Sequence, residues 1–170
     1  ISHSVASRPF LDIAVYSFDE GEEITEETVP GAKLILMLEG TARLCFGADA
    51  QSISASEVVL ISGGAPHAIK AMGQCKLMQM ELEIKGGQMM ERGEYIRKIP
   101  VETVMKLADQ IDYEAQKIAS ITLAQQTNLI LTLFSLDPGE VMGGHASTGD
   151  AMVQVLDGMA EITIGDQVYT

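Results

Sequence analysis

The chain has 170 residues, 46% of them hydrophobic, which gives room for one ordinary domain or one and a half small ones. Its formal net charge of −13 at pH 7 repels phosphate groups, which argues against nucleic acid and membrane surfaces as partners. No run reaches the ~18 apolar residues of a membrane span, and Ile1 is followed by polar residues, unlike the start of a signal peptide.

The two cysteines, Cys45 and Cys75, form neither a disulfide framework nor a paired-thiol metal motif. We interpret them as buried free thiols in a reducing compartment and therefore expect a cytoplasmic location. Six of the nine residues from 19 to 27 are Asp or Glu and none is basic, and we interpret this run as a solvated loop.

The first half of the chain predicts a series of short strands. Residues 5 to 18 form two of them, joined near Arg8 and Pro9, and the second alternates with period two while both faces are partly apolar. Further strands are predicted over residues 33–38, 42–46, 51–54, 58–61, 67–70 and 76–84. Even spacing, frequent turns and the absence of a helical period indicate an antiparallel sandwich or barrel.

Residues 86 to 117 interrupt this pattern. Gly86 and Gly87 open a polar connection, and Pro100 marks the start of a helix. Apolar residues then recur at helical spacing, at Val101, Val104, Met105 and Ala108. We predict one short helix over about residues 101 to 109, in a linker after which the strand pattern resumes at 118.

The chain repeats itself at an offset of 118 positions. Residues 16 to 22, YSFDEGE, align without a gap with residues 134 to 140, FSLDPGE, and turn glycines such as Gly40 and Gly158 also coincide. Such matches indicate two copies of one unit. The first copy spans residues 1–85, the linker 86–117 and the second copy 118–170, which has no counterpart of residues 53 to 84.

These motifs resemble those of the cupin superfamily, in particular bacterial proteins with two cupin repeats. The first motif of that family is Gly, five residues, His-x-His, three or four residues, Glu, six residues and Gly. The second copy keeps Gly139, His145 and Gly158, with Ser147 and Ala151 in place of the second histidine and the glutamate. The resemblance implies an all-β fold of antiparallel jelly-roll barrels with a short helical linker between the repeats.

The first copy departs further from the family pattern. Glu27, Val29 and Lys33 stand at the three ligand positions of the first motif, and the second motif keeps Gly64 and His67. Cupins usually bind a divalent transition metal, such as Zn, Fe, Mn or Ni, with three histidines and a carboxylate. We therefore expect no metal in the first barrel. The second barrel is the candidate metal site, with His145 as its ligand, and His67 is a further candidate ligand.

If the cupin frame holds, Glu27 and Lys33 both point into the barrel near His67, because alternate residues of a strand share a face. The Lys33 ammonium would then supply the charge that a metal supplies elsewhere. The Glu27–Lys33 pair either plugs this site or grips a small polar ligand, so the candidate pocket residues are Glu27, Lys33, His67, His145 and Ser147. Two alternatives stay open: Lys33 extends out of the barrel mouth, and His67 is a hydrogen-bonded loop residue.

The leading functional interpretation is a small-molecule-binding cupin with a degenerate metal site, and we expect a homodimer. The alternative is a metal-dependent oxygenase or isomerase that acts on a small molecule through the second barrel. A sensor or interaction module is a third class. The sequence shows no nucleophile–base pair, so it does not decide whether the chain is an enzyme.

Overall fold

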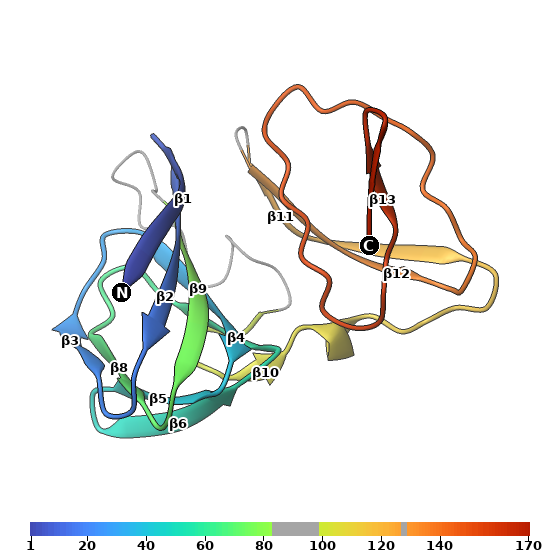
Figure 1. Cartoon of the computed structure of the whole chain (residues 1–170). Coiled ribbons are helices and arrows are strands. Elements are labelled where there is room, and N and C mark those ends of the chain that lie inside the picture. Colours follow the sequence, from blue (N-terminus) through green and yellow to red (C-terminus); the bar gives the residue numbers. More distant parts are fainter. Residues whose placement is uncertain (83–98, 127–128) are drawn as a thin grey trace.

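The computed structural model describes residues 1–82, 99–126 and 129–170, and nearly all their regular structure is antiparallel strand (Figure 1). The strands of the first copy are β1 (Ser2–Arg8), β2 (Leu11–Phe18), β3 (Glu23–Glu27), β4 (Ala32–Glu39), β5 (Thr41–Phe46), β6 (Asp49–Ser54), β7 (Glu57–Ile61), β8 (His67–Ala71) and β9 (Cys75–Leu82). Then follow β10 (Met105–Lys106), a 3-10 turn η1 (Ala108–Gln110), β11 (Ile118–Gln126), β12 (Leu129–Leu136), β13 (Ile162–Ile164) and β14 (Gln167–Tyr169). No helix of the described residues is long and apolar enough to cross a membrane.

Two sheets form the first barrel. The larger has the order β1-β2-β9-β4-β7-β10, and the smaller has the order β3-β8-β5-β6. Apolar side chains of both sheets fill the space between them, including Ile35, Leu44 and Ile69, each at most 1% exposed. The all-β antiparallel architecture expected from the strand pattern is thus confirmed.

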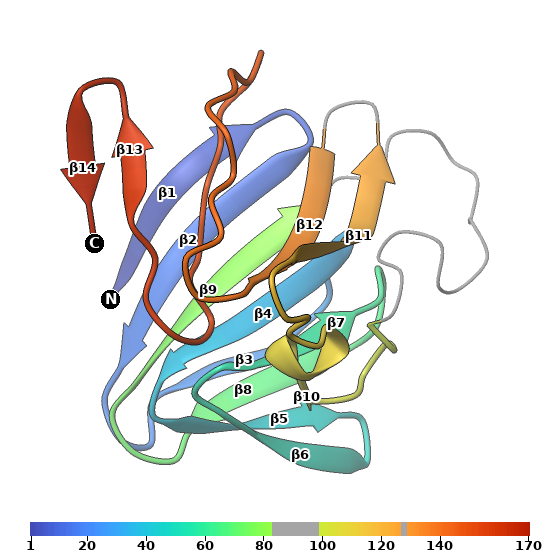
Figure 2. The same cartoon turned by 90° about the vertical axis from the view of Figure 1, so that its right-hand side faces the viewer.

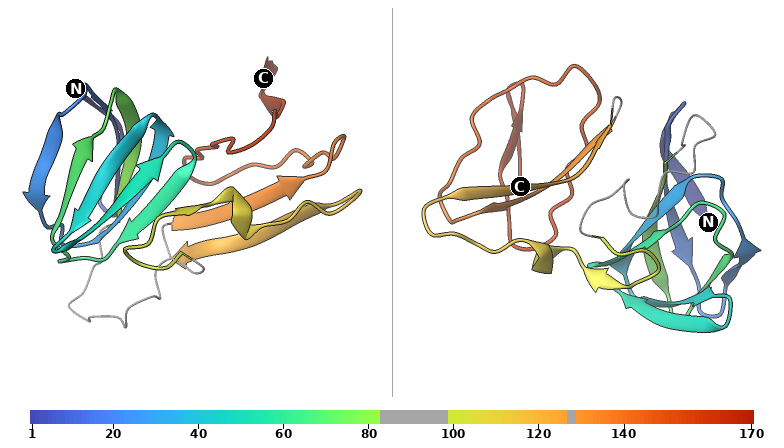
Figure 3. Two further views of the ribbon diagram at one scale, coloured as in Figure 1. Left: turned by 90° about the horizontal axis from the view of Figure 1, so that it is seen from below. Right: turned by 180° about the vertical axis from the view of Figure 1, so that it is seen from behind.

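The larger sheet is covered on its other face as well. In β4, Ile35 and Met37 face the smaller sheet, whereas Leu34 and Leu36 face a second apolar cluster that includes Leu123 of β11. This explains why the sequence of β4 is a continuous apolar run rather than an alternating one. The hairpin β11–β12 lies across this face (Figure 2). Two contacts tie the stretch after β12 to the first copy: Asp150 pairs with Arg8 of β1, and Leu156 packs on the second cluster. The hairpin β13–β14 lies further from the barrel (Figure 3).

The helical part of the linker is shorter than predicted. Only residues 108 to 110 form a helical turn, whereas β10 pairs with β7 and Val101 forms a bridge with Leu60. Val101 and Met105 pack on the apolar cluster beneath β11, and Val104 packs on the barrel core. Pairing with the free edge of β7 therefore outweighs the helical spacing. Gly86 and Gly87 lie outside the described residues.

The acidic run is also more ordered than a solvated loop. Its second half forms β3, which pairs with β8, because Ile24 packs against the barrel core. Glu27 is thereby held at the end of a strand rather than in solution.

The pairing of the second copy repeats that of the first. Tyr16 pairs with Ser2 in the first hairpin, and Phe134 pairs with Ser120, 118 residues later in both strands. A register shift lies between Ser4 and Ala6 in the first hairpin and between Thr122 and Ala124 in the second, again at this offset. The hairpin β13–β14 likewise keeps the register of β5–β6. The sequence repeat therefore corresponds to a repeat of local structure.

Candidate functional site

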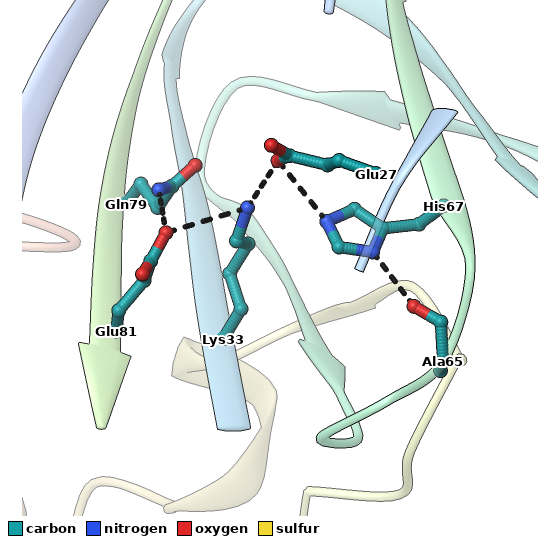
Figure 4. A network of polar contacts seen from close by, with 6 residues as sticks. All are labelled: Glu27, Lys33, Ala65, His67, Gln79 and Glu81. Atoms are coloured by element: carbon teal, nitrogen blue, oxygen red, sulfur yellow. Dashed lines mark hydrogen bonds and ion pairs between the residues drawn. The ribbon is translucent and has the colours of Figure 1, made fainter. Parts of the chain in front are cut away.

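A polar network lies inside the first barrel, where the two sheets meet (Figure 4). Glu27 and His67 are cross-strand partners in β3 and β8 of the smaller sheet. Lys33 and Glu81 are cross-strand partners in β4 and β9 of the larger sheet. Because cross-strand partners project to the same face, both pairs point into the interior and face each other.

Lys33 is the centre of this network. Its Nζ lies 2.5 Å from Oε1 of Glu27 and 3.5 Å from Oε1 of Glu81, and its side chain is 0% exposed. A buried ammonium is tolerated only when it is paired. Lys33 therefore does not extend out of the barrel mouth. The carboxylate side chains are 38% and 36% exposed, so the network reaches solvent through Glu27 and Glu81.

The contacts of His67 determine where its proton lies. Its Nδ1 is 3.0 Å from the carbonyl oxygen of Ala65, and a carbonyl can only accept, so Nδ1 carries the hydrogen. In the neutral ring Nε2 is then an acceptor. Nε2 is buried and has no hydrogen-bond partner among the described residues, with the nearest oxygen of Glu27 3.5 Å away.

Gln79 and Glu81 extend the network, although the sequence analysis did not single them out. Gln79 Nε2 donates to Glu81 Oε1 at 2.6 Å, which fixes the amide orientation, because a flipped amide would place its oxygen against the carboxylate. The Gln79 Oε1 atom is then buried without a partner among the described residues. Period-two alternation in β9 could have found both residues, since they share the inward face of Leu77.

Two residues of β2 lie near this network. Asp12 is the cross-strand partner of Glu81 and is exposed. Tyr16 stacks on Phe18, with ring centroids 6.0 Å apart. Burial raises the pKa of the Tyr16 phenol, and the negative charges of Glu81 and Glu27 raise it further. The carboxylates of the network therefore act on Tyr16 through space.

The network does not fit a transition metal. The donors here are one imidazole nitrogen and the carboxylates of Glu27 and Glu81, and the Lys33 ammonium stands between those carboxylates (Figure 4). An ammonium beside the ligands repels a divalent cation and occupies the carboxylate lone pairs that would bind it. Across the described ranges, no group of three or more His, Cys, Asp or Glu could hold a metal ion.

Two hollows lie elsewhere on the described part of the molecule. One of about 410 Å³ lies over β3, β5 and β8, on the side that carries Arg43 and Lys70. The other, of about 200 Å³, lies near Gln74 and Glu39. Glu27, Lys33 and His67 line neither of these two hollows.

The structure does not bring His145 and Ser147 to this network. Both are exposed, in a stretch from residue 137 to 161 without strands, and Nδ1 of His145 lies 3.1 Å from the carbonyl oxygen of Gly143. This differs from the expected pocket in a second barrel. Residues 150–157, which align with β4 of the first copy, form no strand in the structure.

The comparisons with known proteins concern the fold. The sequence matches no protein-family model and no curated protein. A cupin 2 conserved barrel domain protein from Leptotrichia buccalis is similar in structure, with a TM-score of 0.64 and 22% identity over 79% of this chain and 56% of that chain. This chain thus spans about half of that protein.

Two further solved structures match over about half of this chain. A cupin superfamily protein from Desulfitobacterium hafniense has 28% identity and a TM-score of 0.49, over 49% of this chain and 77% of that chain. Oxalate decarboxylase from Bacillus subtilis, a protein with Mn(II) centres, has 14% identity and a TM-score of 0.42, over 46% of this chain and 22% of that chain. With the two antiparallel sheets of its first barrel and its match to the Leptotrichia protein, the chain has the jelly-roll fold of the cupin superfamily.

Proposed function

We propose that the chain binds a small polar molecule inside the first barrel, at the network of Glu27, Lys33 and His67. One observation supports this above the others: Nε2 of His67 is buried and has no hydrogen-bond partner among the described residues. An unsatisfied buried polar group costs about 1–3 kcal/mol. A ligand group that bonds to Nε2 would recover this free energy.

The position of the network supports the same function. Ligands of small barrels bind in the interior near the mouth, where polar groups from several strands converge. Here the groups come from β3, β4, β8 and β9, and the partly exposed carboxylates of Glu27 and Glu81 give access from solvent. In this proposal the Lys33 ammonium supplies the positive charge in place of a metal.

The three histidines of the chain allow a direct test. Long-range ¹H–¹⁵N spectra of labelled protein resolve the ring nitrogens, and His67→Gln assigns the resonance of interest. Small carboxylates, polyols and amines are then added one at a time. We expect at least one of these compounds to shift the Nε2 resonance of His67, while the resonances of the exposed His3 and His145 stay unchanged. If no compound moves the His67 resonance, the proposed function is wrong.

The alternative function, a metal-dependent oxygenase or isomerase acting through a second barrel, gains no support from the described residues. His145, its expected metal ligand, is exposed and belongs to no group of three or more His, Cys, Asp or Glu among them that could hold a metal ion. Homodimer formation and a cytoplasmic location stay predictions.

A further inference from the structure

We propose that the ligand is a small organic cation, an amine or guanidine, that donates N–H hydrogen bonds to this site. The inference rests on the proposed function and adds the chemical class of the ligand. It follows from which polar atoms lack partners and from the charges around them.

The two buried side-chain atoms without partners among the described residues are both acceptors when the His67 ring is neutral. In the neutral ring Nε2 of His67 is an acceptor because Nδ1 holds the ring hydrogen against Ala65. Oε1 of Gln79 is an acceptor because its amide nitrogen donates to Glu81. A ligand satisfies both atoms only by donating. Amines and guanidines carry several N–H donors, whereas a carboxylate carries none.

The charges around the network favour a cation. Glu27, Glu81 and the neighbouring Asp12 are acidic, and Lys33 is the cation that pairs with the two glutamates. Because Lys33 is fully buried behind these carboxylates, solvent reaches their outer sides rather than the ammonium. An incoming anion would meet the carboxylates first, and the net charge of −13 on the chain would repel it from further away. The carboxylates of the network and the net charge of the chain would both attract an incoming cation.

Three probes with four carbon atoms each separate charge from size. They are 1,4-diaminobutane, which is a dication, erythritol, which is neutral and rich in hydroxyl donors, and succinate, which is a dianion. We expect 1,4-diaminobutane to shift Nε2 of His67, with an apparent affinity that falls as salt is added. Succinate at the same concentration is expected to leave the resonance unchanged, and erythritol to bind more weakly than the diamine.

A matched pair of variants separates the site from the general acidity of the chain. Glu81→Gln removes one carboxylate of the network, and Glu26→Gln removes one from an exposed position on β3 beside the 410 Å³ hollow. Glu81→Gln should lower the affinity for 1,4-diaminobutane by roughly tenfold, which is the effect of losing one hydrogen bond to a charged group. Glu26→Gln should not change the affinity.

The outcomes distinguish this inference from the proposed function. If succinate or erythritol shifts His67 and 1,4-diaminobutane does not, the site binds small molecules but the inference about a cation is wrong. Equal weakening by Glu81→Gln and Glu26→Gln would also overturn it, because attraction would then be unspecific. If none of the carboxylates, polyols and amines shifts His67, both proposals are wrong.

Discussion

Lys33 Nζ lies 2.5 Å from Glu27 Oε1, in the interior of the barrel and out of contact with solvent. These two residues come from different sheets, β4 and β3, and their ion pair joins the sheets beside His67. In our proposal the Lys33 ammonium takes the place of the metal cation that a cupin site would hold. Our predictions test this replacement, the charges around it and the packing that positions it.

The first prediction concerns the charge of residue 33. Lys33→Glu removes the resident ammonium and adds a carboxylate beside Glu27, Glu81 and His67. Imidazole nitrogen together with carboxylate oxygens suits divalent transition metals such as Mn and Zn. We expect the variant to bind close to one equivalent of Mn²⁺ or Zn²⁺, measured by metal analysis after dialysis, and the wild-type protein to bind none in the first barrel.

Lys70→Glu is the control for this variant. Lys70 lies on β8, the strand of His67, but its side chain is 54% exposed and points away from the network. The change in net charge is the same, so a metal gained by both variants would reflect the acidity of the chain and contradict the prediction. Circular dichroism shows whether each variant folds.

The second prediction concerns the titration of Tyr16. Its pKa lies above the ordinary value of 10.0 because of burial and the charges of Glu81 and Glu27. Phenolate absorbance is measured against pH for wild type and for Tyr16→Phe, and the difference between the two curves reports Tyr16. The midpoint of this difference curve should therefore lie above pH 10. Glu81→Gln should lower this midpoint. A midpoint at or below 10 would contradict the raised pKa, and an unchanged midpoint in Glu81→Gln would show that this carboxylate does not act on Tyr16.

The same shift makes stability depend on pH. Because the pKa of Tyr16 is raised on folding, the folded protein holds this proton more tightly than the unfolded chain. The resulting stabilisation is complete below pH 10 and is lost as the pH rises through the folded-state value. Urea unfolding should therefore show a steeper loss of stability above pH 10 for wild type than for Tyr16→Phe.

The third prediction concerns the tight turn between β4 and β5. Gly40 has φ of +76°, and a Cβ at this position would clash with the carbonyl oxygen of Gln74. Gly40→Ala should lower the free energy of unfolding by about 1–2 kcal/mol for the left-handed conformation and by about 1–3 kcal/mol for the steric clash. Urea unfolding of the variant and the wild type measures the total loss.

Gly21→Ala is the matched control in the same barrel. Gly21 has φ of +81°, and no atom lies within 4 Å of the place that an added methyl group would take, so only the conformational cost applies. Equal losses for the two variants would show that the approach of Gln74 does not constrain residue 40.

The fourth prediction concerns the contact between the two copies. Leu123 of β11 is 1% exposed and packs in the apolar cluster that covers the larger sheet. Leu123→Ala should destabilise the protein by about 2–5 kcal/mol, as for other buried leucines. Ile130→Ala on the paired strand β12 should have little effect, because Ile130 is 66% exposed. A similar loss for both variants would contradict the packing described here.

Local features of the fold could be predicted from the sequence because they depend on neighbouring residues. Period-two alternation predicts β2, and the alignment of Gly40 with Gly158 predicts turns that both have φ of +76°. The helix predicted over residues 101 to 109 was largely wrong, because Met105 pairs with β7, a partner nearly fifty residues earlier in the chain. Helical spacing alone contains no information about a free sheet edge.

The strands, the turns and the repeat could be found without coordinates, since they follow from contacts within short segments. Which residues of each copy become buried, and which side chains meet, depends on the tertiary structure. Leu123 and Val5 hold the same bulge position in the two hairpins, yet Leu123 is 1% exposed and Val5 is 56% exposed. In the same way, Gln79 and Glu81 join Lys33 only because β9 pairs with β4, and His67 joins them only because the second sheet closes over the first. Such contacts depend on which strands pair and which sheets pack, and local periodicity does not specify either.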